Sequence, residues 1–560
     1  MNNKVKLVLI VMAVIFILQA VTSMRLKSQT WDETDYFGLG YYLLKYRKWD
    51  IPASTLHPPL TYYLNSLPYL FYDADENAWD LPPSLKCPEC SNIANPIAGL
   101  TLLTDKRYPQ DRLIFYSRIS TIFIALILGF FLWKWTNELY GSFAALFALF
   151  LFTFSPNILA HSRLVTPDLA ISCFNFISVY YLWKVIKENK WSNILLCSLF
   201  LGCALLSKYS AVLLFPIYFV LSAFVCLSKE KVGLPAQFPF SHLLMREGSI
   251  FKILRICSVL FIIFTMAFFL LQLGYMFHIE HYLKGILYQW EHASKGHPTF
   301  LMGMYSSQGW WFYYLVAFAI KTPLPLLAFL IMSFIFYKKN PDRSMLNHTF
   351  VLIPVVVYIL FFSLKLLCVG LRYMLPIYPF LFMQASMVIG ASFKKRKMLS
   401  KIIIAVLCCW YLKSSIGIYP HYLAYFNEII GGPDNGCEYL VDSNLDWGQD
   451  LKGLGLYMKE KGIDKVHLSY FGAADPHYYG IEYDWMPSYY LPSDYLDEGV
   501  KIRRFKIPKS GMVAISATNL QSVYFSGNNF YDWLKRYEPI DKIGYSIFIY
   551  DLDHSKRSIR

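Results

Sequence analysis

Charged residues are scarce in this sequence. Asp, Glu, Lys and Arg together make up 16% of the 560 residues, whereas soluble domains carry roughly 25%. Hydrophobic residues make up 56% of the chain, and the mean hydropathy is +0.37. This composition favours a polytopic α-helical membrane protein over a soluble enzyme.

A basic stripe with interleaved aromatic residues is also lacking. The formal net charge is +14, but the cytoplasmic loops of membrane proteins are normally rich in Lys and Arg. The excess of positive charge therefore gives no reason to expect a nucleic acid as a partner.

No cluster of side chains with obvious metal-ligand spacing is found. Of the eleven cysteines, Cys87 and Cys90 form the one close pair in a polar segment. This pair is a weak zinc signal, because a structural zinc site usually needs four ligands. A local disulfide is at least as compatible with an oxidising compartment. The sequence indicates no certain cofactor and leaves the need for a divalent metal open.

Long apolar runs, in contrast, are abundant. The first lies within residues 1–24, is about 18 residues long and has no Ala-x-Ala cleavage site after it, so we expect a spanning helix and not a signal peptide. Later runs centre near residues 124, 150, 176, 199, 219, 264, 323, 358, 380 and 410. Their lengths predict about eleven transmembrane helices within residues 1–418.

The basic connecting segments indicate which side each loop faces. If the N-terminus is cytoplasmic, the Lys- and Arg-rich connections fall on the inside, as the positive-inside rule requires. An odd number of spans then places the loops 25–111 and 276–309 outside. We expect both loops to lie over a site at the outer face of a multi-pass plasma membrane protein.

Residues 419–560 have a composition typical of soluble domains and are expected outside. Strand patterns occur near 437–444, 464–472, 509–517 and 542–552, and helical patterns at 445–462 and 529–539. This predicts a small extracytoplasmic α/β domain. Its aromatic stretch 475–490 fits either sugar stacking or a membrane-interface belt, and it contains no complete catalytic triad or phosphate loop.

Cations at the predicted outer face run against the usual trend, and four of them are considered together: Arg163, Lys208, Lys321 and Arg372. Each alone is explained by a side chain that reaches from a helix end to the lipid headgroups. Together they are better explained by a shared anionic ligand, and a lipid phosphate fits the depth and the charge.

Carboxylates lie at the same predicted depth. Asp32 follows the first span, and Asp168 follows Pro167 and opens an apolar run. Acids after a first helix usually mark a solvated boundary. Two acids beside a cluster of cations instead suggest an acid/base site that faces an anionic leaving group.

These motifs, taken in order, resemble those of the GT-C class of lipid-carrier-dependent glycosyltransferases, in the branch of protein O-mannosyltransferases and aminoarabinose transferases. Each motif is weak alone, but their order and sidedness over residues 1–230 are fairly specific. The motifs are Asp32-Glu33, His57-Pro58-Pro59, Ser155-Pro156 with Arg163 and Asp168, and Leu206-Ser207-Lys208.

The resemblance implies a GT-C fold and transfer of a sugar, with inversion, from a polyprenyl-phosphate donor to an acceptor hydroxyl of a protein, lipid or glycan. It gives the role of catalytic base to Asp32, has Glu33 bind or orient the acceptor, and lets Asp168 line the same cavity. The four cations would bind the donor phosphate. His57 would bind that phosphate or a metal, or it is a turn histidine before two prolines.

The resemblance leaves hexosyl and pentosyl transfer open. One rival class is a lipid-phosphate phosphatase or ligase on the same surface. Another is a transporter of lipid-linked sugars, but transporters tend to show internal repeats and broken helices near the middle of the membrane. The sequence has no convincing repeat, and its acids gather at one face, which favours the enzyme.

Overall fold

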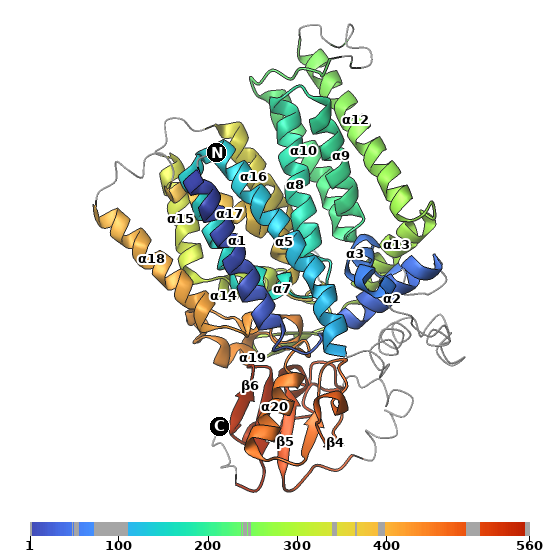
Figure 1. The fold of residues 1–560 in the computed structure, drawn as a ribbon, viewed down its shortest axis with the longest axis vertical. Coiled ribbons are helices and arrows are strands. Elements are labelled where there is room, and N and C mark those ends of the chain that lie inside the picture. Colours follow the sequence, from blue (N-terminus) through green and yellow to red (C-terminus); the bar gives the residue numbers. More distant parts are fainter. Residues whose placement is uncertain are drawn as a thin grey trace.

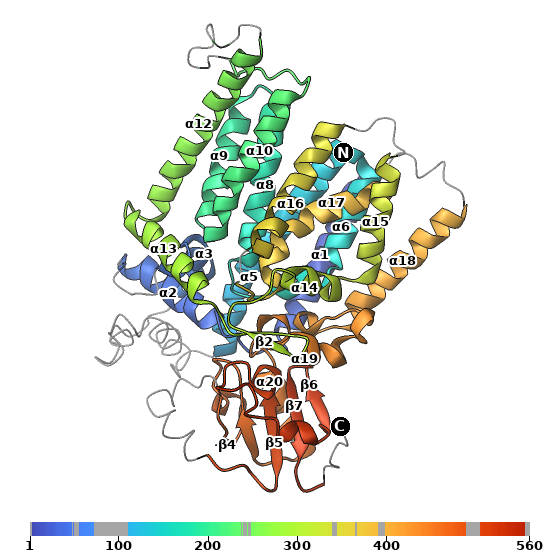
Figure 2. The ribbon, with the colours of Figure 1, turned by 180° about the vertical axis from the view of Figure 1, so that it is seen from behind.

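The computed structural model describes residues 3–47, 49, 55–71, 110–236, 238, 244, 248–338, 344–364, 367–389, 398–488 and 505–554. Figures 1 and 2 show a bundle of helices with a sheet and its connecting segments at one end. The N-terminus lies at the end of the bundle away from the sheet. Cys87 and Cys90, the predicted metal or disulfide pair, lie outside the described residues.

Seven helical segments in the described residues are long and apolar enough to cross a membrane. Six are single helices, and the seventh combines a short 3₁₀ turn with α10 in the segment Tyr209–Leu227. These segments are α1 (Asn3–Met24), α5 (Gln110–Tyr140), α8 (Asp168–Lys187), α10 (Leu214–Leu227) with its turn, α12 (Ser249–Gly274), α16 (Met345–Leu364) and α18 (Met398–Gly417). The prediction of a polytopic α-helical chain is confirmed.

Two further predicted spans are bent pairs of helices. Helices α6 (Ser142–Thr153) and α7 (Pro156–Ser162) meet at 62°, and α14 (Tyr313–Lys321) meets α15 (Leu324–Lys338) at 107°. Proline explains both breaks, since it lacks an N–H and fits the first turn of a new helix. Counting each pair as one span gives up to nine.

The bend between α14 and α15 leaves backbone carbonyls without helical partners, and Asn427 binds them. Its Nδ2 donates hydrogen bonds to the carbonyls of Ala319 and Thr322 at 2.6 and 2.8 Å, and its own N–H donates to the carbonyl of Ile320 at 2.8 Å. Non-helical backbone at membrane depth needs such internal partners. The segment after α18 therefore completes this break.

The last two predicted spans are shorter than expected. Helix α9 (Trp191–Leu205) has 15 residues, and the run near 380 forms a 3₁₀ segment, Leu371–Ile377, followed by the nine-residue α17 (Tyr378–Ser386). The remaining helices and strands of the bundle and its loops are α2 (Glu33–Tyr46), α3 (Leu60–Ser66), α13 (Glu280–Lys295), β1 (Thr299–Leu301) and β2 (Met304–Ser306).

The C-terminal region forms a five-stranded sheet in the order β4-β3-β5-β7-β6. Strand β3 is parallel to β4 and β5, whereas β7 is antiparallel to both β5 and β6. The bounds are α19 (Gly436–Tyr439), α20 (Leu451–Lys461), β3 (Val466–Ser469), β4 (Tyr483–Trp485), β5 (Met512–Ser516), α22 (Ala517–Leu520), β6 (Asp541–Ile543) and β7 (Ile547–Asp551). The predicted mixture of helices and strands is confirmed.

Two elements predicted in this region are wrong. Residues 437–444, predicted as a strand, form the end of α19 and a 3₁₀ turn, and residues 529–539, predicted as a helix, contain one short 3₁₀ turn, Leu534–Arg536. Contacts between the segment at 437–444 and the helical bundle account for the first error, because tertiary packing overrides the local strand pattern.

The C-terminal region docks on the bundle through buried polar contacts. Lys27, just after α1, forms an ion pair with Asp450, and its ammonium also lies 2.5 Å from Nδ1 of His421. The N–H of Trp31 donates to the carbonyl of Trp447 at 2.9 Å. The first loop and the C-terminal region therefore meet directly.

Candidate active site

Four of the predicted site residues form one chain of ion pairs. Asp32 Oδ2 lies 2.8 Å from Arg372 Nη1, which lies 3.9 Å from Asp168 Oδ2. Asp168 Oδ1 accepts a hydrogen bond from Lys208 Nζ at 2.6 Å. Asp168 is completely buried, whereas the Asp32 side chain is 23% exposed. The structure thus brings together two acids and two cations that are distant in sequence.

Local backbone geometry places Arg372 at the centre of this chain. Gly370 precedes it with φ +133°, and a Cβ there would collide with Oγ of Ser443. A side chain at position 370 would both strain the backbone and push the C-terminal region away. Glycine at this position allows the 3₁₀ segment that carries Arg372 to approach the segment after α19.

Aromatic rings lie under both cations. Lys208 Nζ is 3.8 Å from the ring centroid of Tyr373, and Arg372 Cζ is 4.3 Å from that of Trp447. Cation–π contacts of this kind stabilise partly desolvated cations by about 0.5–2 kcal/mol. Trp447 belongs to the C-terminal region, so that region completes the surroundings of Arg372.

His57 and Tyr36 lie beside the ion pairs. Their rings stack with centroids 5.5 Å apart. Among the described residues, neither Nδ1 of His57 nor the Tyr36 hydroxyl has a hydrogen-bond partner. Burial, reinforced by the charge of Lys208, lowers the pKa of His57 to about 3. His57 is therefore neutral near pH 7 and offers a hydrogen bond, not a charge, to an anion.

The pKa of Asp32 is raised above its ordinary value. Burial is the largest cause, and the neighbouring guanidinium of Arg372 partly offsets it. A carboxylate with a raised pKa is a stronger proton acceptor once it is ionised. Its partial exposure also leaves it accessible to a reacting group.

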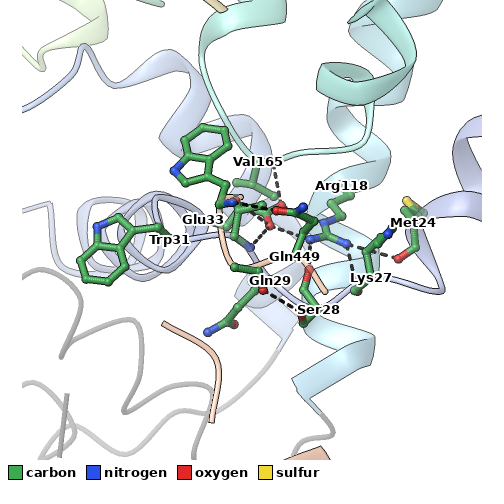
Figure 3. A network of polar contacts seen from close by, with 12 residues as sticks. Met24, Lys27, Ser28, Gln29, Trp31, Glu33, Arg118, Val165 and Gln449 are labelled. Atoms are coloured by element: carbon green, nitrogen blue, oxygen red, sulfur yellow. Dashed lines mark hydrogen bonds and ion pairs between the residues drawn. The ribbon is translucent and has the colours of Figure 1, made fainter. Parts of the chain in front are cut away.

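Glu33 lies apart from this chain, within a closed network (Figure 3). Its carboxylate accepts hydrogen bonds from Nε and Nη2 of Arg118 at 2.8 and 2.6 Å, and from the backbone N–H of Thr30 and Val165 at 2.7 and 2.8 Å. Burial alone would raise the pKa of Glu33, but Arg118 and these amides lower it. Both oxygens are occupied, which favours a structural role over the predicted contact with an acceptor.

Lys321 and Arg163, the other two predicted phosphate contacts, are not brought into the ion-pair chain. Lys321 Nζ donates to the carbonyls of Leu423, Tyr425 and Asn444 at 3.0, 3.0 and 2.5 Å. Arg163 Cζ lies 5.5 Å from the ring centroid of Tyr422. Both cations therefore face the C-terminal region, residues 419–560.

Sequence reasoning missed several polar residues of the site. Asp442, which has φ +55°, accepts a hydrogen bond from the Tyr524 hydroxyl at 2.5 Å, and that hydroxyl lies 3.1 Å from Nε2 of His297. Arg118 was overlooked because it lies inside an apolar run. The four-residue spacing of Asp442, Asp446 and Asp450 is a signal that would have drawn attention to this segment.

The described residues contain no group of three or more His, Cys, Asp or Glu side chains arranged to hold a metal ion. The chemistry that its residues themselves offer is proton acceptance by a carboxylate next to cations that can bind an anion.

Comparison with known proteins supports the resemblance drawn from the motifs. Residues 111–240 match the model of the dolichyl-phosphate-mannose-protein mannosyltransferase family. This stretch contains Ser155-Pro156 with Arg163 and Asp168, and Leu206-Ser207-Lys208, two of the four motifs on which the resemblance depends. The predicted class, a membrane glycosyltransferase of the GT-C type, is confirmed. No curated protein matches the chain in sequence.

The solved structures that are similar to this chain include the following two. One is ArnT from Cupriavidus metallidurans bound to undecaprenyl phosphate, at 10% identity and TM-score 0.48, covering 96% of this chain and 97% of that chain. The other is the archaeal oligosaccharyltransferase AglB from Archaeoglobus fulgidus in complex with an inhibitory peptide and a dolichol-phosphate, at 13% identity and TM-score 0.44, covering 96% and 72%.

Proposed function

We propose that this protein transfers a sugar from a polyprenyl-phosphate donor to an acceptor hydroxyl, with inversion at the anomeric carbon. The observation that carries the proposal is the chain of ion pairs from Asp32 through Arg372 and Asp168 to Lys208. It places a base and an anion site side by side. The family match over residues 111–240 supports the lipid-linked donor.

In the proposed reaction, the acceptor O–H bond breaks and its proton passes to Asp32. The acceptor oxygen forms a bond to the anomeric carbon on the face opposite the phosphate. The bond between that carbon and the phosphate oxygen breaks, and its electron pair leaves with the polyprenyl phosphate. Lys208 and Arg372 stabilise the negative charge that develops there.

We assign the donor phosphate to Lys208 and Arg372, with neutral His57 as a hydrogen-bonding neighbour. Asp168 binds both cations, so it holds them in place and limits the net charge of the site. Arg163 and Lys321 are left out of this assignment because their contacts lie elsewhere. Glu33 is assigned to holding the first loop against α5.

We further propose that the N-terminus is cytoplasmic and that residues 419–560 form an extracytoplasmic domain over the helical part, residues 1–418. The N-terminus and the sheet lie at opposite ends of the molecule, which supports placing them on opposite sides of the membrane (Figure 1). The Lys- and Arg-rich connections assign the N-terminus to the cytoplasmic side. A cysteine at Asn435 should react with an impermeant thiol reagent in whole cells, and one at Lys190 should react only after lysis. The reverse pattern would invert the topology.

The rival classes give different products from the same donor. Purified protein in vesicles is incubated with a polyprenyl-phosphate sugar that carries the label in its sugar. The incubation is done with and without a candidate protein, lipid or glycan acceptor. A transferase attaches the label to the acceptor and releases polyprenyl phosphate. Label released as free sugar phosphate or free sugar indicates hydrolysis, and intact donor moved across the bilayer indicates a transporter. Either of the last two results, in place of transfer, overturns the proposal.

A further inference from the structure

A second cluster of buried cations lies outside the proposed catalytic site. Lys27, Arg118 and Arg163 line a small cavity, together with Ala160, Leu164, Leu423 and Gln449. None of the four residues of the ion-pair chain lines it. Figure 3 shows Lys27, Arg118 and Gln449 next to one another in this region. The cavity lies where the first loop, α5 and the C-terminal region meet.

Two of the three cations have counter-ions within the protein. Lys27 pairs with Asp450, and Arg118 pairs with Glu33. Arg118 also donates to the carbonyls of Met24 and Ser28 at 3.3 and 2.9 Å. The positive charges of Lys27 and Arg118 are therefore balanced one for one.

Arg163 has no such partner among the residues that the structure describes. It is 3% exposed, and neither Nε nor Nη1 has a hydrogen-bond acceptor there. Its guanidinium lies over the ring of Tyr422. Leaving a buried charge without a partner costs several kcal/mol, and buried guanidinium N–H groups are normally satisfied. One positive charge and two donor groups are therefore in excess at this cavity.

We propose that this cavity binds one small monovalent anion of the chloride type, held by Arg163. One anion balances the single uncompensated charge. The rest of the lining, Ala160, Leu164 and Leu423, is apolar and offers no donors for the several oxygens of a larger anion. The Gln449 amide nitrogen is already bonded to the carbonyl of Leu445 and to Asp450.

The bound anion stabilises the turn that carries Asp168. Arg163 directly follows α7, and Val165, two residues on, donates its N–H to Glu33. Asp168 follows at the start of α8. The anion site thus supports the geometry of the catalytic site without touching the substrate, and it does not depend on the proposed reaction being correct.

The test measures thermal unfolding of the full chain in detergent, with sodium chloride replaced stepwise by sodium gluconate at constant ionic strength. We expect a saturable rise of the unfolding midpoint with chloride. The response should be lost in Arg163→Gln, which should be at least as stable as the unchanged protein in gluconate. Lys459→Gln, at an exposed position of α20, is the matched control and should keep the response.

Equilibrium dialysis with radioactive chloride provides a measurement that needs no variant. About one chloride per chain, displaced by bromide, supports the site even if Arg163→Gln fails to fold. No chloride bound to the unchanged protein means that water satisfies Arg163 and overturns the proposal. An equal response of the midpoint in Arg163→Gln and in the control indicates a general salt effect and also overturns it.

Discussion

Glu33 has one role according to the family resemblance and a different role according to the structure. Resemblance gives Glu33 a contact with the acceptor, whereas the structure surrounds its carboxylate with Arg118, Thr30 and Val165. Glu33→Gln tests the two roles. Glutamine has one carbonyl oxygen that can accept hydrogen bonds. Its NH₂ group would take the place of the second carboxylate oxygen and would face N–H groups that need an acceptor. The variant also leaves the Arg118 charge buried without its partner.

Removing one partner of a buried ion pair costs about 3–5 kcal/mol. The total stability of a folded protein is about 5–15 kcal/mol, so the loss should be readily measured. We expect Glu33→Gln to lower the free energy of unfolding by that amount in a denaturant titration in mixed micelles. The folded fraction should keep its KM for the acceptor, because Glu33 is buried and both of its carboxylate oxygens already accept hydrogen bonds from Arg118 and from backbone amides.

A second variant removes the charge of Arg118, which Glu33→Gln leaves without a partner. Arg118→Met alone should also destabilise strongly, but the double variant should lose less than the sum of the two, since replacing both members of a buried pair is much less costly. Glu460→Gln, exposed on α20, serves as the control. Unchanged stability of Glu33→Gln together with an acceptor KM raised tenfold or more would refute the structural role.

Three further predictions concern charge at defined positions. Asp32→Asn should lower sugar transfer about 10²–10⁴-fold, the usual scale of general base catalysis, while donor binding, measured separately, persists; near-normal transfer would move the role of base to Asp168. Lys208→Met and Arg372→Met should each raise the donor KM by about 10- to 150-fold, because charge-assisted hydrogen bonds contribute about 1.5–3 kcal/mol; unchanged donor kinetics in both would exclude the phosphate assignment. Burial raises the pKa of Asp446 from 3.8 to about 8, so the folded protein keeps a proton there that the unfolded chain releases. The free energy of unfolding should therefore fall by up to about 1.4 kcal/mol per pH unit between these pKa values, and Asp446→Asn should remove that slope in unfolding measured across this range.

The sequence was sufficient to predict the helical membrane class and the residues of the ion-pair chain. The length of an apolar run is enough to predict a membrane span. A charged residue at membrane depth is costly, so its presence indicates a functional or structural role. Asp32, Asp168, Lys208 and Arg372 were noticed on that basis, and the structure brings all four together. Their catalytic and binding roles remain predictions.

Partners of single charges could not be predicted. Arg118 and Glu33 are 85 positions apart, and no local pattern connects them. The positions of Lys321 and Arg163 depend on how the segment after α18 folds back on the bundle, which hydrophobic periodicity does not describe. The same docking gives residues 437–444 a helical and turn conformation, although their sequence pattern predicts a strand. Long-range packing therefore explains both kinds of error.

The ring of Trp447 beneath Arg372 has a consequence for biosynthesis. The four charged residues of the ion-pair chain have all been synthesised once translation reaches residue 372, but the ring that covers the guanidinium comes 75 positions later. A nascent or truncated chain that ends before Trp447 contains the acids and cations without the ring that stacks on Arg372. The surroundings of Arg372 are therefore complete only after Trp447 has been added, and a chain that stops in the last helices of the bundle lacks this ring.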